Sequence, residues 1–399
     1  MNKLPPLHIV VLALVGSACS AASTTSSEPG APVAAPKCKA DTECAGSTGA
    51  PVCDAPTGAC VALPAGSEIG RGDGSPASVT FTELYSTGAA SKPVDLAFHV
   101  ERPGEVWVVG SGDNSVHVGT GLDTDAPAFK RFLDPAARHF MHKPPAIAMG
   151  SATQWATCGD NDNSQNGPAN LFMGPATFTT DLSVFAKKTS GGLGSHFDML
   201  HNSPNCRGIA HAKDAWYWVF NDYDKSLDKY NFGKDHEPGG DDHSDGEIYR
   251  YAAGKVKGAT DGTPSHLFFD AEDEFLYVAD TGNKRIVRLD TTKGAKGGSL
   301  ERFNEPLKAD AVMTGTALEV VVEAGVLEKP SGLEIRGGLL YVTDAATSTF
   351  YVFDKTGKQI RSLDTGLPAG SLAGFVFGPG NKVYFTDKVG GRVLRIDPP

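Results

Sequence analysis

The sequence contains no apolar run long enough to cross a membrane as a helix, because Leu7 to Val15 falls far short of the roughly 20 residues required and no later run comes close. It also lacks a nucleophile elbow, a P-loop and a dinucleotide-binding fingerprint, so the enzyme classes that these motifs mark gain no support. Positive charge is not in excess, with 36 Lys and Arg against 47 Asp and Glu and a net charge of −11. Phosphate recognition needs clustered cations, so no nucleic-acid partner is expected.

The N-terminus has the parts of a secretory signal: a cation at Lys3, the short apolar run and then the small residues Gly16-Ser17-Ala18 before Cys19. This pattern predicts a signal peptide with a lipobox over residues 1–19, lipidation at Cys19 and contact with the membrane only through that lipid anchor. Ordinary cleavage after Ala22 is the alternative to lipidation, and a buried N-terminal helix is the alternative to export. The expected location is the outer membrane or cell surface as a lipoprotein, and otherwise the periplasm or the medium.

Two short segments follow this signal. Residues 20–36 are almost entirely Ser, Thr, Ala, Pro and Gly, which predicts a flexible linker because they offer little apolar surface to bury. Residues 37–62 hold four cysteines and almost no apolar core, which predicts a small disulfide module. This module is similar to short Cys-rich segments of myxobacterial surface proteins. A zinc site is the alternative, although the segment has no CxxC pair. Its cysteines are Cys38, Cys44, Cys53 and Cys60.

The remaining chain, residues 76–399, repeats one pattern six times: an apolar strand opened by a turn residue, a loop, and a second strand that ends on a small or acidic residue. Short strands in repeated units bury their apolar faces by stacking unit on unit, so the expected fold is all-β, a six-bladed β-propeller. A generic β-sandwich is the alternative. The copies begin at Pro93, Pro145, Arg207, Pro264, Pro330 and Leu372.

The stretch Asp280-Thr281-Gly282-Asn283-Lys284-Arg285-Ile286 resembles the NHL-repeat consensus, and the resemblance extends over roughly residues 90–399. It implies a propeller of the NHL type. A propeller ring closes when one end of the chain supplies a strand to the blade at the other end. The lone strand pattern Val79–Tyr85 is therefore expected to complete the blade that ends at Asp397.

Long insertions in blades 2 to 4 hold most of the histidines. His142, His201 and His266 each stand near the start of an inner strand, where neighbouring blades converge on the channel axis. Imidazole is a common ligand of zinc and similar metals, so these three residues are predicted to bind one divalent metal at the mouth of the channel. The alternative is that each histidine caps a turn or packs singly.

The stretch Ser195–His201 resembles a His-Phe-Asp-Met-Pro-His stretch of peptidyl-α-hydroxyglycine α-amidating lyase, a propeller of the NHL type. In that family, central histidines hold zinc, and the resemblance implies this role for His201. Leu200 replaces the proline of the family stretch. The catalytic Tyr and Arg of the family have no match in this chain, so the resemblance covers the metal ligand and not the catalytic residues of the lyase.

A second candidate is the acidic loop, residues 235–247, in which carboxylates and imidazoles alternate with glycines. Mixed nitrogen and oxygen ligands suit zinc, copper, iron or manganese, whereas the odd-position spacing of the acids also resembles a calcium loop. A solvated loop without a metal is the alternative. A weaker calcium-loop spacing over 162–167 lacks its closing Glu. The predicted ligands in the acidic loop are His236, Asp241, Asp242 and His243.

Cys158 ends a strand of blade 2, and Cys206 opens blade 3. Adjacent blades would bring the two together, which predicts a disulfide that clamps the insertion between them. A reactive thiol is the alternative.

Two classes of function fit these features. The first is a binding module whose propeller face holds a protein, peptide or glycan, with a metal site at the mouth of the channel. The second is a metal-dependent enzyme, similar to a lyase or hydrolase, with its site in blades 2 to 4. The fold alone does not decide between them.

Overall fold

The computed structural model describes residues 38–54, 56–162, 171–189, 191–240, 242–300, 303 and 305–397. The chain divides into two compact units, Met1–Leu63 and Pro64–Pro399. The predicted signal peptide with Cys19, the linker, Asp241 and all but Asp162 of the weak 162–167 calcium pattern lie outside the described residues.

The first unit is a disulfide-bonded hairpin. Strands β1 (Val52–Asp54) and β2 (Ala59–Val61) pair antiparallel and follow a 3₁₀ helix, η1 (Asp41–Cys44). Two disulfides join Cys38 to Cys53 and Cys44 to Cys60, as the cysteine count predicts. All four sulfurs are therefore bonded, which leaves no thiolate here for zinc.

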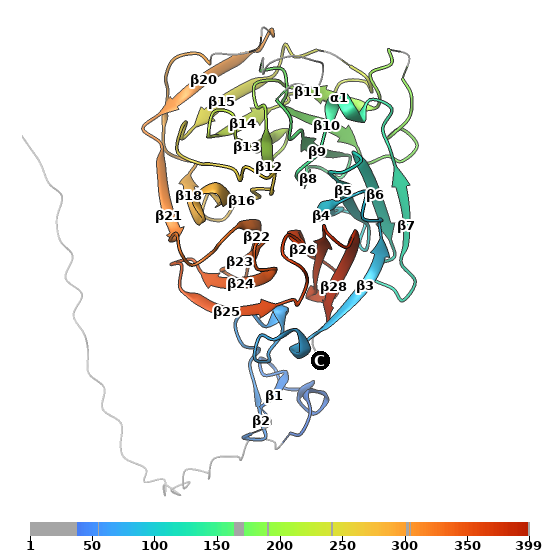
Figure 1. Cartoon of the computed structure of the whole chain (residues 1–399), viewed down its shortest axis with the longest axis vertical. Coiled ribbons are helices and arrows are strands. Elements are labelled where there is room, and N and C mark those ends of the chain that lie inside the picture. The colour runs from blue at the N-terminus through green and yellow to red at the C-terminus, as the bar shows by residue number, and fades with distance from the viewer. Residues whose placement is uncertain are drawn as a thin grey trace, which may run out of the picture. The chain divides into compact units, whose positions relative to one another are not determined.

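The described strands of the second unit form a ring of six sheets, which confirms the predicted six-bladed propeller (Figure 1). Blade 1 contains β4 (Pro93–Phe98), β5 (Val106–Gly110), β6 (Ser115–Thr120) and β7 (Ala128–Phe132). Blade 2 contains β8 (Ile147–Met149), β9 (Gln154–Cys158), β10 (Pro175–Thr179) and β11 (His196–Met199). Blade 3 contains β12 (Cys206–Lys213), β13 (Trp216–Asn221), β14 (Ser226–Asn231) and β15 (Glu247–Tyr251).

The second half of the ring repeats this order. Blade 4 contains β16 (Leu267–Asp270), β17 (Phe275–Asp280), β18 (Arg285–Asp290) and β21 (Ala317–Val322). Blade 5 contains β22 (Pro330–Arg336), β23 (Leu339–Asp344), β24 (Thr349–Asp354) and β25 (Gln359–Asp364). Blade 6 contains β26 (Leu372–Phe377), β27 (Val383–Asp387), β28 (Arg392–Asp397) and β3 (Thr80–Ser86). Each inner strand contacts the next one around the ring, and β26 contacts β4.

The second strand of every blade is the core of its sheet, because both of its faces are covered by neighbouring blades. An aromatic residue occupies its second or third position in all six blades and is at most 1 % exposed. Trp107 of blade 1 and Trp155 of blade 2 show how these residues join blades, with ring centroids 5.6 Å apart. The repeated sequence pattern therefore marks the layers that hold the ring together. The six residues are Trp107, Trp155, Tyr217, Tyr277, Tyr341 and Tyr384.

The ring closes as predicted, because β3 pairs antiparallel with β28. The segment before β3 belongs to the same compact unit as the propeller, Pro64–Pro399. Ile69 is buried in the core between blades 5 and 6, and the Tyr341 hydroxyl donates a hydrogen bond to Glu68. This segment therefore adds packing to the seam at which the ring closes.

A crossover, residues 291–316, interrupts blade 4 between its third and fourth strands. It carries β19 (Ala295–Lys296) and β20 (Ala309–Thr314). Strand β20 pairs parallel with β15 and antiparallel with β19, so the sheet of blade 3 gains a fifth and a sixth strand from this crossover. Figure 1 shows β20 lying outside β15 at the edge of the ring. The crossover brings residues 303 and 305 next to the end of blade 2.

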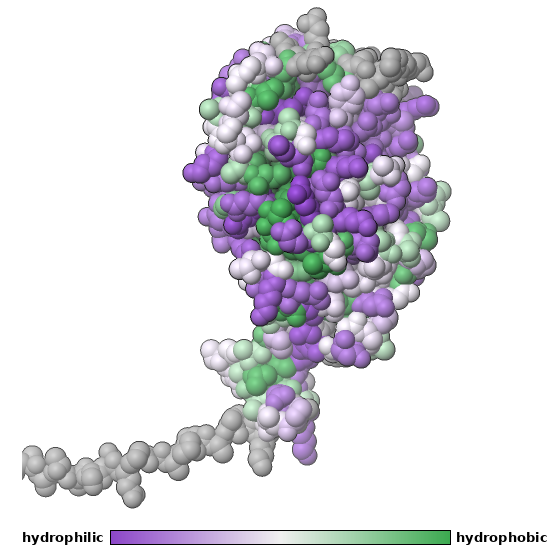
Figure 2. Space-filling view, turned by 60° about the vertical axis from the view of Figure 1, so that its left-hand side comes forward, coloured by the Kyte–Doolittle hydropathy of each residue, from purple (hydrophilic) through white to green (hydrophobic). Residues whose placement is uncertain are grey.

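Cys158 at the end of β9 and Cys206 at the start of β12 form the predicted disulfide between blades 2 and 3. No helix among the described residues is long and apolar enough to span a bilayer. The side of the propeller that Figure 2 presents is mainly hydrophilic, with apolar residues in scattered patches between polar ones.

Candidate functional site

A cavity of about 490 Å³ lies beside β11, the outermost strand of blade 2, and is called the rim pocket here. It shares no lining residue with the central channel, so it does not lie among the inner strands where a metal site was expected. Its walls come from the α1 segment (Ala137–Phe140), β11, the acidic loop and the crossover. Its lining residues are His139, Phe140, Phe172, Leu193, His196, Met199, His201, Asp242, His243, Phe303, Glu305 and Pro306.

Glu305 is the centre of a buried hydrogen-bond network in this pocket. Its Oε2 atom lies 2.6 Å from Nδ1 of His201 and 3.1 Å from Nδ1 of His243, and its Oε1 atom accepts a hydrogen bond from Asn202. Burial tends to raise the pKa of Glu305, but the hydrogen bonds from the two histidines outweigh burial and leave the pKa below its usual value. Glu305 is therefore a buried, ionised carboxylate with defined partners.

These three residues also have the spacing of a metal site. Ligand atoms of His201, His243 and Glu305 all lie within 4.8 Å of one another, and all three residues are buried. Two imidazoles and one carboxylate form a ligand set found in catalytic zinc and non-haem iron sites.

Asp198 of β11 lies on the other side of His243. Its Oδ1 atom is 3.9 Å from Nε2 of His243, and its Oδ2 atom is 3.8 Å from Nδ1 of His236. The side chain is 1 % exposed, and within the described part of the chain neither oxygen has a hydrogen-bond partner. Burial raises the pKa of Asp198 to about 8, with His243 acting in the opposite direction.

His236 lies between two acids. Its Nδ1 atom faces Asp198, and its Nε2 atom lies 3.7 Å from Oδ1 of Asp245. Nδ1 of His236 and Oδ1 of Asp245 are both buried without a hydrogen-bond partner among the described residues. The acidic loop therefore brings two imidazoles to Asp198, and its Asp245 carboxylate lies beside the other nitrogen of His236.

The acidic loop is held against blade 2 by close backbone contacts. The Gly239 amide donates a hydrogen bond to the carbonyl of His196. At Gly246, a Cβ atom would lie 2.6 Å from Leu200, so a larger residue would push the loop away from β11. This contact accounts for the glycine at position 246 of the loop.

Aromatic rings form much of the wall around His201. The ring of Phe303 lies 4.5 Å from the His201 ring, and the ring of Phe172 lies 4.8 Å from it. Phe140 stacks on His196 at 3.5 Å. The pocket therefore offers flat apolar surfaces next to a polar floor.

The structure does not bring the three histidines of the predicted channel-mouth site together. His142 lines a separate cavity of about 350 Å³ and accepts a hydrogen bond at Nδ1 from Asn161. His266 lines the central channel, and only His201 lines the rim pocket. No group of three metal-ligand atoms among the described residues contains His142 or His266.

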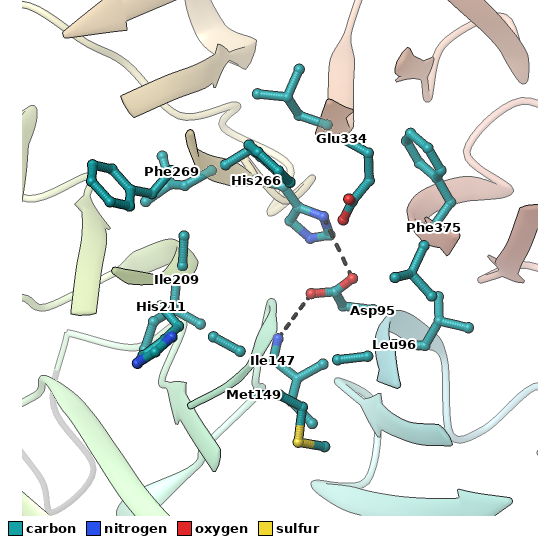
Figure 3. A pocket seen from close by; sticks show the side chains of 17 residues that line it. Asp95, Leu96, Ile147, Met149, Ile209, His211, His266, Phe269, Glu334 and Phe375 are labelled. Carbon is teal, nitrogen blue, oxygen red and sulfur yellow. Dashed lines mark hydrogen bonds and ion pairs between the residues drawn. The ribbon is translucent and has the colours of Figure 1, made fainter. Parts of the chain in front are cut away.

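His266 belongs instead to a polar cluster inside the central channel (Figure 3). Its Nδ1 atom lies 3.7 Å from Asp95, and its Nε2 atom lies 3.1 Å from the carbonyl of Pro145. Glu334 projects into the same channel, which has a volume of about 210 Å³. Burial raises the pKa of both Asp95 and Glu334, and Asp95 adds to the rise at Glu334.

In the acidic loop, the structure brings His236 and His243 to the site, whereas Asp242 lies on the exposed rim and accepts a hydrogen bond from Ser244. Sequence reasoning missed Glu305 and Asp198 as site residues, and it considered Asp245 only as part of a calcium-loop spacing. Asp198 and Asp245 stood inside stretches that were considered for metal binding. Glu305 carried no sequence signal, because its partner His201 lies 104 positions away.

No protein-family profile matches the chain, and no curated protein matches its sequence. The auxiliary nutrient binding protein from Bacteroides ovatus ATCC 8483 is similar in structure, with a TM-score of 0.50 at 13% identity over 80% of this chain and 72% of that chain. Virginiamycin B lyase from Staphylococcus aureus gives 0.47 at 11%, over 80% and 99% of the two chains. The luciferin-regenerating enzyme gives 0.46 at 12%, over 80% and 95%. Likenesses at these identities concern the propeller fold alone.

Proposed function

We propose that this chain is an exported NHL-type propeller lipoprotein that acts as a binding module at the cell surface or in the periplasm. Its ligand, a short stretch of a protein, peptide or glycan, enters the rim pocket, where the buried histidine–carboxylate cluster holds a divalent metal. The observation that carries the proposal is the pocket itself: aromatic walls over a floor of converging imidazoles and carboxylates.

The size and composition of the pocket support binding. A cavity of about 490 Å³ falls within the usual range for ligand sites, which combine apolar walls with a few convergent polar groups. Rigid aromatic side chains such as Phe172 and Phe303 provide contact area at small entropic cost. The fold is shared with a protein described as an auxiliary nutrient binding protein, which is consistent with a binding role.

Two features of the chain support export. The leader pattern ends on Cys19, and the described residues contain three disulfides, which persist in oxidising compartments. Expression of the full chain in a bacterium with labelled fatty acid tests the anchor. Label is expected on wild-type protein and absent from Cys19→Ser, and label on both or neither would contradict lipidation.

The binding proposal is tested by thermal-shift screening of the purified chain against soluble glycans and peptides, with and without zinc. Ligands are expected to raise the Tm of the wild type in a concentration-dependent way. Phe303→Ala should abolish the shift, whereas Tyr223→Ala, an exposed aromatic outside the pocket, should leave it unchanged. Shifts that survive Phe303→Ala would place the ligand elsewhere, and no shift with any probe would contradict the proposal.

A metal-dependent enzyme, similar to a lyase or hydrolase, is the second candidate. Two imidazoles and a carboxylate beside a pocket leave coordination positions for water or substrate, as in catalytic zinc sites. The discriminating measurement is turnover of a bound ligand. Conversion that is lost with a chelator and restored by metal would favour the enzyme, and stable binding without conversion favours the module.

A further inference from the structure

The carboxylates of Glu305 and Asp198 differ in their hydrogen-bond partners. Glu305 has hydrogen-bond partners on both oxygens, at distances of 2.6 to 3.1 Å. Both oxygens of Asp198, by contrast, have none among the described residues, although the side chain is almost fully buried. A buried carboxylate without partners is costly, so a protein retains one where something else satisfies it.

The spacing around Asp198 suggests what that partner is. Its oxygens lie 3.8 Å from Nδ1 of His236 and 3.9 Å from Nε2 of His243. These separations exceed hydrogen-bond length but are spanned by two metal–ligand bonds of about 2.0–2.2 Å each. Ligand atoms of these three described side chains do not all lie within 4.8 Å of one another, so the imidazoles would have to rotate towards Asp198 for one cation to contact all three.

The other nitrogen of each imidazole faces a carboxylate. Nδ1 of His243 lies 3.1 Å from Glu305, and Nε2 of His236 lies 3.7 Å from Asp245. Metal-binding histidines commonly give their second N–H to a carboxylate, which fixes the tautomer and the orientation of the ring. In this geometry, Glu305 is a positioning residue for His243. The 3.7 Å contact of Asp245 is longer than a hydrogen bond, so Asp245 would orient His236 only after the ring rotates.

We infer that one divalent transition metal is bound by Asp198, Nδ1 of His236 and Nε2 of His243, and that Glu305 and Asp245 orient the two imidazoles without binding the metal. The inference rests on the metal of the proposed function and assigns its ligands. His201 is then a hydrogen-bond partner of Glu305 and not a ligand. A set of two nitrogens and one carboxylate suits zinc, iron(II), cobalt or manganese better than calcium.

The test uses the purified mature chain, stripped with a chelator and titrated with Co²⁺, with visible absorption and elemental analysis as readouts. The wild type is expected to bind one cobalt ion. Asp198→Asn and His236→Gln should lose the cobalt band, because each removes a ligand. Glu305→Gln should keep the stoichiometry but weaken binding by about 10- to 100-fold, the usual effect of losing an orienting carboxylate.

His201→Gln is the decisive variant, because it separates this assignment from a metal held by His201, His243 and Glu305. It should keep the stoichiometry and the position of the band, as should Glu237→Gln, a control at an exposed position of the same loop outside the pocket. Circular dichroism establishes whether each variant is folded. If Asp198→Asn does not fold, His236→Gln, at a partly exposed position, still tests the ligand assignment.

Loss of cobalt in His201→Gln, with retention in His236→Gln and Asp198→Asn, would overturn the ligand assignment while leaving the proposed metal intact. Absence of metal binding in the wild type would instead refute the metal of the proposed function itself.

Discussion

Oε2 of Glu305 lies 2.6 Å from Nδ1 of His201, although 104 positions separate the two residues in the sequence. Glu305 belongs to the crossover of blade 4, and His201 follows the last strand of blade 2. This contact joins elements that the ring alone would not bring together. It also places an ionised carboxylate in a buried position, where the two histidines and Asn202 are among its partners. The two histidines of the rim site therefore share one buried acceptor.

Glu305→Ala is expected to lower the free energy of unfolding by roughly 2–4 kcal/mol, because it removes the acceptor of several buried hydrogen bonds. Urea unfolding of the metal-free chain measures the change. Glu319→Ala is the matched control, since Glu319 is half-exposed on blade 4 and pairs with Arg288 at the surface. That change should cost less than about 1 kcal/mol. Equal effects of the two substitutions would contradict a special role for Glu305.

Removal of the Cys158–Cys206 disulfide should destabilise the propeller. The bond closes a loop with a sequence separation of 48 residues, for which chain-entropy arguments give about 4 kcal/mol. The double variant Cys158→Ala/Cys206→Ala is expected to unfold at lower urea concentration than the wild type. Peptide mapping without reductant should recover the three described pairs, and a crosslink between the hairpin unit and the propeller would contradict them.

The closing strand β3 makes a truncation prediction. A chain that begins at residue 64 keeps β3 and the segment packed on blades 5 and 6, and it should fold cooperatively. A chain that begins at residue 88 leaves β28 as an unpaired edge, which favours aggregation. Size-exclusion chromatography and thermal unfolding compare the two, and equal monomer yield and Tm would contradict the role of β3.

His117 predicts how stability depends on pH. It is buried in β6 between Ser91, Ser115 and Tyr85, and burial lowers its pKa to about 4, with Asp113 opposing and Arg131 reinforcing the shift. The unfolded chain therefore binds this proton more readily, so stability is full above pH 6.5 and falls as the pH drops towards 4.

The loss at His117 should amount to roughly 1–3 kcal/mol. His117→Gln should flatten this part of the profile, measured by urea unfolding at several pH values. His211→Gln, on the partly exposed end of β12, is the control substitution with which the His117 variant is compared. An unaltered profile in His117→Gln would show that other groups cause the acid sensitivity.

Asp198→Asn should make the metal-free chain more stable, because it replaces a buried carboxyl that lacks partners with a neutral side chain of the same shape. A gain of about 1–2 kcal/mol is expected. The same substitution should remove the stabilisation that added metal gives the wild type. A lower stability of the metal-free variant would contradict this prediction, because it would mean that Asp198 makes stabilising interactions in the metal-free chain.

The blades could be predicted from sequence because each carries its own local signal. The second strand repeats an apolar run with an aromatic residue near its start, as at Tyr277 and Tyr341, and stacking requires that residue in every blade. The closing strand was also predictable, since Val79–Tyr85 is a strand pattern left over ahead of six complete repeats. Such features depend on short-range sequence alone.

The site was only partly predictable, because its residues meet through irregular segments. His236 and His243 were found from their unusual loop, but Glu305 arrives on a crossover whose path no repeat pattern specifies. His142 and His266 share a sequence position with His201, yet the insertion that ends in β11 carries His201 away from the channel axis. Similar positions in successive repeats therefore did not imply a shared site.

The pairing of β20 with β15 has a consequence for the order in which the molecule assembles. A growing chain that ends at residue 290 already holds all four strands of blade 3, but it contains neither the fifth strand of that sheet nor Glu305. His201 and His243 must wait for their common partner until three strands of the next blade have been made. The ring then stays open until Arg392–Asp397 pairs with β3, so the first strand of the propeller remains unpaired until the last strand has been made. Chaperones that keep such a chain unfolded until its final residues are synthesised would prevent misfolding at both the seam and the rim site.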